Sequence, residues 1–151
     1  MAAAARRRPV PPVPPAAELA LGHIEHFLVL SDDMDGTRDF YERVLGLVDG
    51  ERPPLPFPGY WLYLGDVPAV HVADRAGYVA HAESAGTGSS AAADSTGAVD
   101  HIAFSATGYD ELKARLAENG VSAAENEVPG VMRQLFIEDP NGVRVELNVR
   151  S

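Results

Sequence analysis

Four residues of metal-ligating type occur in two pairs that share one spacing. His26 lies in an apolar run, and His101 lies in a similar run 75 positions later (101 minus 26). His71 and Glu146, each within a further apolar run, are separated by the same 75 positions (146 minus 71). Imidazole and carboxylate groups are common ligands of divalent metals, so the spacing predicts one metal site shared by two copies of a repeated unit.

Strand geometry explains how one residue in each run can serve such a site. Side chains alternate between the faces of a strand, so a single polar residue can point into a cavity while its neighbours pack in the core. Two copies side by side would set His26 opposite His101, and His71 opposite Glu146. Because burying a polar group without a partner costs a few kcal/mol, matched polar residues in apolar strands favour ligation.

The elements around these residues repeat in the same order. In the first half we expect a helix at 35–45 and strands at 23–30, 47–52, 60–64 and 69–73. In the second half we expect a helix at 109–118 and strands at 99–106, 122–128, 131–137 and 143–149. Each half is therefore a strand–helix–strand–strand–strand unit, and the expected fold class is α+β.

Two segments fall outside the repeat. Residues 75–97 are rich in Gly, Ser and Ala without a steady period, so we expect a long irregular connection between modules at 22–74 and 98–149. Residues 1–20 are rich in Ala, Arg and Pro but lack the apolar stretch of a signal peptide. We expect them to form a disordered tail before a single domain at 21–150.

Composition restricts the possible classes of protein. The chain has 151 residues and is 46% hydrophobic, which suffices for one domain with a core. It has no cysteine, so thiolate ligands and disulfides are excluded. A net charge of −10 argues against binding to nucleic acid or to an anionic membrane, and no apolar run approaches the roughly 20 residues of a membrane span. We expect a cytoplasmic protein.

The motifs at these positions resemble those of the vicinal oxygen chelate superfamily, which includes glyoxalase I, fosfomycin-resistance enzymes, methylmalonyl-CoA epimerase and extradiol dioxygenases. The resemblance covers residues 22–149 and rests on the segments 26–32, 40–47, 100–104 and 139–147. It implies that each unit is a βαβββ module and that the modules form an eight-stranded cup around one divalent metal, which could be Fe, Ni, Zn, Mn or Co.

The resemblance also implies roles for individual residues. His26, His101 and Glu146 match metal-ligand positions of the superfamily. His71 falls where glyoxalases and epimerases carry a fourth ligand, usually Glu or Gln, so a histidine there departs from the pattern. Because many relatives pair, the resemblance further implies a homodimer.

The role of His71 separates the reactions open to such a site. With four protein ligands, a six-coordinate metal keeps two positions for adjacent oxygens of a small substrate, and Glu146 or His71 could move a proton, as in a glyoxalase-like lyase or isomerase. With His71 unbound, two His and one carboxylate leave room for O₂, as in an Fe(II) extradiol dioxygenase. A metal-free, antibiotic-binding protein is the third alternative and ranks last because the ligand set is complete.

Residues from two strands are expected to line the substrate pocket. Tyr60, Trp61 and Tyr63 lie on one strand and could form an apolar wall. Arg133 and Gln134 are neighbours on another strand, so alternation turns one of them inward, and Arg133 could bind a substrate carboxylate. We therefore expect Tyr60, Trp61 and Arg133 to contact the substrate.

Overall fold

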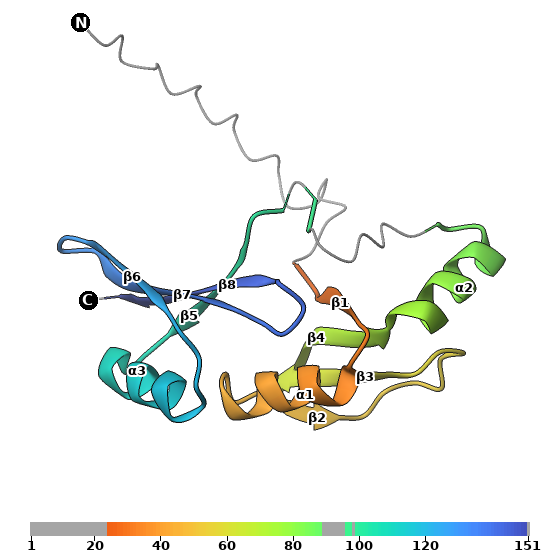
Figure 1. Ribbon diagram of the computed structural model, residues 1–151, viewed down its shortest axis with the longest axis horizontal. Coiled ribbons are helices and arrows are strands. Elements are labelled where there is room, and N and C mark those ends of the chain that lie inside the picture. The colour runs from red at the N-terminus through yellow and green to blue at the C-terminus, as the bar shows by residue number, and fades with distance from the viewer. Residues whose placement is uncertain (1–23, 89–95, 98, 151) are drawn as a thin grey trace, which may run out of the picture.

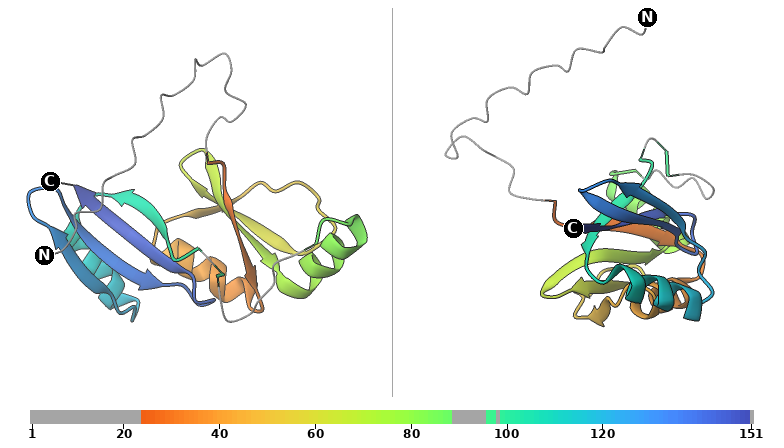
Figure 2. Two further views of the ribbon diagram at one scale, coloured as in Figure 1. Left: turned by 90° about the horizontal axis from the view of Figure 1, so that it is seen from above. Right: turned by 90° about the vertical axis from the view of Figure 1, so that its left-hand side faces the viewer.

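The computed structural model describes residues 24–88, 96–97 and 99–150. The tail expected at 1–20 lies outside these residues, as do positions 89–95 of the expected connection and position 98 of the expected second module. The described chain contains two modules, which lie side by side when seen from above (Figure 2).

The two modules have the same topology (Figure 1). The first consists of β1 (Phe27–Ser31), α1 (Met34–Arg43), β2 (Val48–Gly50), β3 (Gly59–Leu64) and β4 (Val67–Asp74). The second consists of β5 (Ile102–Ala106), α3 (Tyr109–Glu118), β6 (Ala124–Val128), β7 (Met132–Glu138) and β8 (Arg144–Arg150). The expected α+β class and the two βαβββ units are thus confirmed. None of the helices in the described chain has the length and apolar character needed to cross a membrane.

Each module forms its own four-stranded sheet. The strand orders are β1-β4-β3-β2 and β5-β8-β7-β6, so β1 and β5 are both edge strands. In each sheet the first strand is parallel to the last, and the remaining pairs are antiparallel. Equivalent strands of the repeat therefore present equivalent positions on equivalent faces.

The helices α1 and α3 lie next to each other along one side of the molecule (Figures 1 and 2). Each module has its own cluster of buried apolar side chains beneath its helix. Phe40, Leu45 and Phe104 pack against both clusters, so the two cores are continuous across the module boundary. Burial of apolar surface is the main stabilising term of folding, and here it also joins the repeats.

Buried hydrogen bonds connect α1 to the turn between β7 and β8. The hydroxyl of Tyr41, which is fully buried, donates to Oδ2 of Asp139 at 2.9 Å. Nδ2 of Asn141 donates to the hydroxyl of Thr37 at 2.9 Å. Burial and the neighbouring Asp139 raise the pKa of Tyr41, so the phenol remains a donor. We call these two contacts the inter-module link.

We expected an irregular connection over 75–97, but the first part of this segment is helical. Residues Arg75–Ala85 form α2, which directly follows β4. The side chain of Asp74 caps it by accepting from the backbone N–H of Gly77 at 2.8 Å, and Gly86 ends it with a φ of 73°. Alanine, which gave the segment its low-complexity composition, is also the strongest helix former.

Replacing Tyr41 with Phe should lower the free energy of unfolding by about 1–3 kcal/mol, because one oxygen of the buried Asp139 carboxylate loses its principal partner. Urea unfolding followed by circular dichroism would measure the loss. Tyr60→Phe is the matched control, since its hydroxyl bonds to Asp35 at an exposed position. Equal losses in the two variants would contradict a structural role for the inter-module link.

Candidate functional site

Three rings of the first module form one continuous stack. His71 on β4 lies between His26, which precedes β1, and Trp61 on β3. The His26 and His71 ring centroids are 3.7 Å apart with 13° between planes, and those of Trp61 and His71 are 4.1 Å apart with 9°. Trp61 and His71 are cross-strand partners, so strand pairing sets their contact. We call these three residues the ring stack.

In the second module, amides surround a His–Glu pair. Nε2 of His101 lies 2.7 Å from Oε2 of Glu146, which is only 7% exposed. The other carboxylate oxygen of Glu146 accepts from Nε2 of Gln134 at 2.6 Å. Gln134 also donates to Asn148 at 3.0 Å and accepts from Asn126 at 2.6 Å. This amide network fixes the orientation of the Glu146 carboxylate.

An acidic residue directly precedes His26, and another directly precedes His101. Nδ1 of His26 lies 3.1 Å from Oε1 of Glu25, and Nδ1 of His101 lies 2.7 Å from Oδ2 of Asp100. These acid–His dipeptides are themselves 75 positions apart, so the repeat could have identified them, although the sequence analysis missed them. A carboxylate at one ring nitrogen orients an imidazole and leaves the other nitrogen for a ligand or a proton.

His71 has an unusual electrostatic environment. Burial of the ring and the neighbouring His26 lower the pKa of His71 from its ordinary value of 6.5 to about 4. Among the described residues, its buried Nε2 has no hydrogen-bond partner. At neutral pH the ring is therefore uncharged, and its Nε2 lone pair is free to accept a proton or bind a cation.

The structure brings the four expected ligands together as two pairs. His26 contacts His71, and His101 contacts Glu146. Within the part of the chain that the structure describes, no group of three or more His, Asp or Glu residues is close enough to share a metal ion. Convergence of all four side chains thus does not occur within a single chain.

Two expected substrate contacts lie on the opposite face of their strands. Tyr60 packs under Arg38 of α1, whose Cζ lies 4.6 Å from its ring centroid, and bonds to Asp35. Arg133 lies over the Tyr109 ring of α3 at 3.5 Å. Both residues therefore face the helices, and Trp61 shares a face with His71 instead. Side chains alternate along β7, so only one of Arg133 and Gln134 can face Glu146. In the structure that residue is Gln134.

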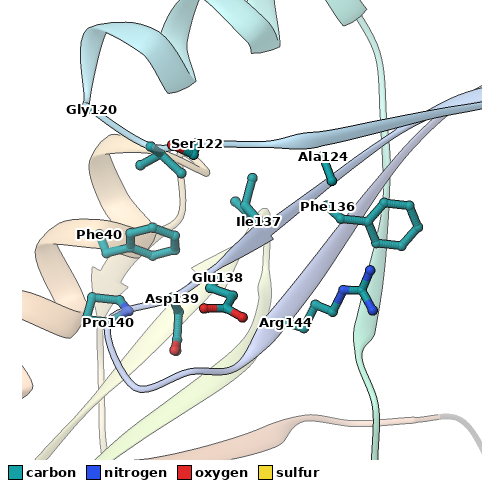
Figure 3. A pocket seen from close by; sticks show the side chains of 11 residues that line it. Phe40, Gly120, Ser122, Ala124, Phe136, Ile137, Glu138, Asp139, Pro140 and Arg144 are labelled. Atoms are coloured by element: carbon teal, nitrogen blue, oxygen red, sulfur yellow. The ribbon is translucent and has the colours of Figure 1, made fainter.

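A hollow of about 660 Å³ borders the His101 side of the molecule (Figure 3). Residues of α1, β6, β7 and β8 line it, and Phe136 and Arg144 lie next to each other at one end. The Phe136 ring meets the His101 ring edge-to-face at 6.1 Å, and Arg144 lies over Phe136 at 4.7 Å. Phe136 follows Trp61 by 75 positions, so the sequence analysis could have found this second aromatic neighbour of an imidazole.

The chemistry of the donors fits a divalent transition metal. The buried Nε2 of His71 lacks a partner, and leaving such a group unsatisfied is costly. Nε2 of His101 lies 2.7 Å from the Glu146 oxygen, so the two atoms share a proton in this contact, and both are of metal-ligating type. Three imidazoles and one carboxylate form a nitrogen and oxygen set that suits Zn, Fe, Ni, Mn or Co.

Comparison with known proteins identifies the family. Residues 23–147 match the family described as the Glyoxalase/Bleomycin resistance protein/Dioxygenase superfamily. The chain belongs to this superfamily. No curated protein matches the chain. The resemblance found in the sequence motifs is therefore confirmed at the level of the superfamily.

Solved structures share the fold at low sequence identity. Lactoylglutathione lyase from Agrobacterium tumefaciens has a TM-score of 0.64 and 22% identity, with 85% of this chain and 94% of that chain covered. The antibiotic-binding protein TnmS3 from Streptomyces sp. CB03234 has a TM-score of 0.61 and 20% identity, with 88% and 99% covered. A variant of the fosfomycin resistance protein FosX from Listeria monocytogenes, complexed with Mn(II) and 1S,2S-dihydroxypropylphosphonic acid, has a TM-score of 0.64 and 16% identity, with 87% and 94% covered.

The lowered pKa of His71 predicts a pH-dependent stability. As the pH falls from 6.5 toward about 4, the unfolded chain takes up this proton before the folded chain does. The free energy of unfolding of the chelator-treated protein should therefore decrease across this interval. His71→Phe keeps a ring in the stack but cannot be protonated, so its decrease should be smaller. Urea unfolding at several pH values would measure both, and parallel curves would contradict the assignment.

Proposed function

We propose that this protein is a divalent-metal-dependent enzyme of glyoxalase-like type, a lyase or isomerase acting on a small molecule with adjacent oxygen atoms. His26, His71, His101 and Glu146 would hold the metal. The observation that carries the proposal is the His101–Glu146 contact at 2.7 Å, in which the buried carboxylate is oriented by Gln134. When bound, the cation would act as a Lewis acid on the adjacent oxygens of the substrate.

The chain's own residues supply the proton transfer. His71 is uncharged near neutral pH, and its Nε2 has no competing partner within the described chain, so it can bind the metal or, when it is not a ligand, accept a proton. Glu146 is the second candidate base, because the amide network holds one of its oxygens and leaves the other directed at His101. Gln134 therefore positions the carboxylate rather than reacting itself.

We propose that a homodimer completes the metal site. One chain presents its donors as two separate pairs, and a four-donor site requires that a first-module pair meets a second-module pair. His26 and His101 both lie at the start of edge strands, and their side chains are 36% and 38% exposed, so a second copy can reach them. Light scattering of the purified protein would test the dimer.

A metal-free small-molecule binding protein is the second candidate, and the ring stack favours it. His26 and His71 lie parallel at 3.7 Å, an arrangement that buries ring faces against each other rather than directing both nitrogens at one point. Stacked rings at the wall of a cavity suit the binding of planar ligands. The structural similarity to TnmS3, an antibiotic-binding protein, is consistent with this candidate.

Metal content separates the two candidates. Protein purified without chelator should carry about one divalent ion per chain by elemental analysis, because a site of three imidazoles and one carboxylate binds such ions tightly. Glu146→Gln and His101→Ala should each reduce retention at least about tenfold, since each removes a ligand. The matched controls are Glu125→Gln, at a surface ion pair with Lys113, and His81→Ala on α2.

Two results would reject the enzyme proposal and leave the binding protein. The first is metal retention that is unchanged in Glu146→Gln. The second is a wild type that binds no metal even after incubation with Zn, Ni, Mn or Fe(II). Isomerisation of a hemithioacetal panel is the expected activity of the metal-loaded protein. Oxygen uptake with a panel of catechols would instead assign the Fe(II) extradiol dioxygenase, in which His71 does not bind the metal.

A further inference from the structure

A groove of about 410 Å³ opens beside the ring stack, on the side of Trp61. It is formed by the segment that follows β2 and by β3, and its lining consists of Glu51, Arg52, Pro53, Trp61 and Tyr63. Its volume falls in the range of small-molecule sites. Trp61 both lines this groove and stacks on His71, so the indole connects the groove to the ring stack.

Arg52 brings an unpaired positive charge to this groove. Among the described residues it has no carboxylate within ion-pair distance, although most described arginines do: Arg38, Arg43, Arg75, Arg133 and Arg144. Its Nε is buried without a hydrogen-bond partner. In a chain with a net charge of −10, a half-buried guanidinium without an anionic partner indicates that an anion from outside the chain can bind there.

The guanidinium of Arg52 is held in place rather than free in solvent. Nη2 donates to the carbonyl of Phe57 at 2.7 Å, and Cζ lies 5.2 Å from the Phe57 ring centroid. Gly59 gives it room, since an added Cβ there would lie 3.1 Å from Nη2. Phe57 is in turn packed against α2 through Tyr78 and His81, each with its ring centroid 5.3 Å away. A fixed donor loses little entropy on binding a ligand.

The wall of the groove that β3 provides is aromatic. The Tyr63 ring lies across Gly50, where an added Cβ would approach ring carbons at 2.7 Å. Its hydroxyl donates to the carbonyl of Glu51 at 2.8 Å, which holds the ring in this position. Tyr63 and Trp61 therefore offer two adjacent aromatic surfaces, against which a planar ligand can stack.

We propose that this groove, the Arg52 groove, binds planar organic acids, with the carboxylate at Arg52 and the ring against Trp61 and Tyr63. Their acid group and ring would thus define the substrate class of the neighbouring site. A cationic ligand would be repelled by Arg52, and a purely aliphatic acid would leave the aromatic wall unused. The assignment of these acids as substrates rests on the proposed function, whereas binding in the groove can be measured without metal.

The protein contains a single tryptophan, so its fluorescence reports on this groove. Titration of the metal-free protein with phenylacetate should change Trp61 emission in a saturable way. The neutral isostere phenylacetamide and the ringless acid acetate should each bind at least about tenfold more weakly, because each lacks one of the two recognised groups. Equal affinity for phenylacetate and phenylacetamide would overturn the proposal.

Variants of Arg52 test the role of its charge. Arg52→Gln should weaken phenylacetate binding about tenfold and leave phenylacetamide unchanged, whereas Arg52→Lys should retain much of the preference for the acid. Arg43→Gln, at an exposed position on α1, is the matched control and should bind as the wild type does. Circular dichroism verifies that each variant is folded. Unchanged phenylacetate affinity in folded Arg52→Gln would reject the site.

One further variant separates this inference from the proposed function. Glu146→Gln removes a proposed metal ligand in the other module and should leave phenylacetate binding unaltered. If that variant loses metal and still binds the acid, both proposals stand. If the wild type binds phenylacetate and no metal, the groove stands and the enzyme does not. If metal binds and phenylacetate does not, the groove assignment fails alone.

Discussion

The hydrogen bond between Tyr41 and Asp139 is the contact on which the geometry of the two halves depends. It is buried and connects α1 of the first module to the turn that precedes β8 of the second. Asp139 also accepts from the backbone of Asn141 and Val143, so the same carboxylate shapes the turn and holds it against the helix. Since Glu146 is carried by β8, its position relative to the first module follows from this bond and from the shared core around it.

The two modules share a backbone plan but differ in the chemistry of their inner faces. In the first, β3 and β4 carry Trp61 and His71, and the face is aromatic. In the second, β7 and β8 carry Gln134, Phe136 and Glu146, so the aromatic ring equivalent to Trp61 lies beside a network of amides around a carboxylate. The first face suits flat apolar groups, and the second holds a charged donor rigidly. The two faces therefore suit different chemical groups.

The sequence predicted the two modules and the four candidate donors because both follow from a single repeat spacing. It expected His26 to face His101 and His71 to face Glu146, whereas the structure places His26 against His71 and His101 against Glu146. It did not predict how the pairs meet, because that depends on packing between modules, which no spacing encodes. Strand alternation reduced the choice to Arg133 or Gln134 but could not decide it without knowing which face α3 covers. The same spacing of 75 positions relates Phe136 to Trp61 and Asp100 to Glu25, so these residues could have been predicted from the sequence. The sequence did not predict the helix α2, because alanine is common both in flexible linkers and in helices.

The helix α2 has a consequence for ligand selection, because it carries none of the proposed metal ligands. This helix packs against Phe57, and the carbonyl of Phe57 accepts from Arg52, so the guanidinium of the Arg52 groove is held by a segment separate from the donors. Mutations in α2 can alter which molecules are accepted while the donors on the repeated strands stay intact. Ligand preference and the set of proposed metal ligands are thus determined by separate segments of the chain.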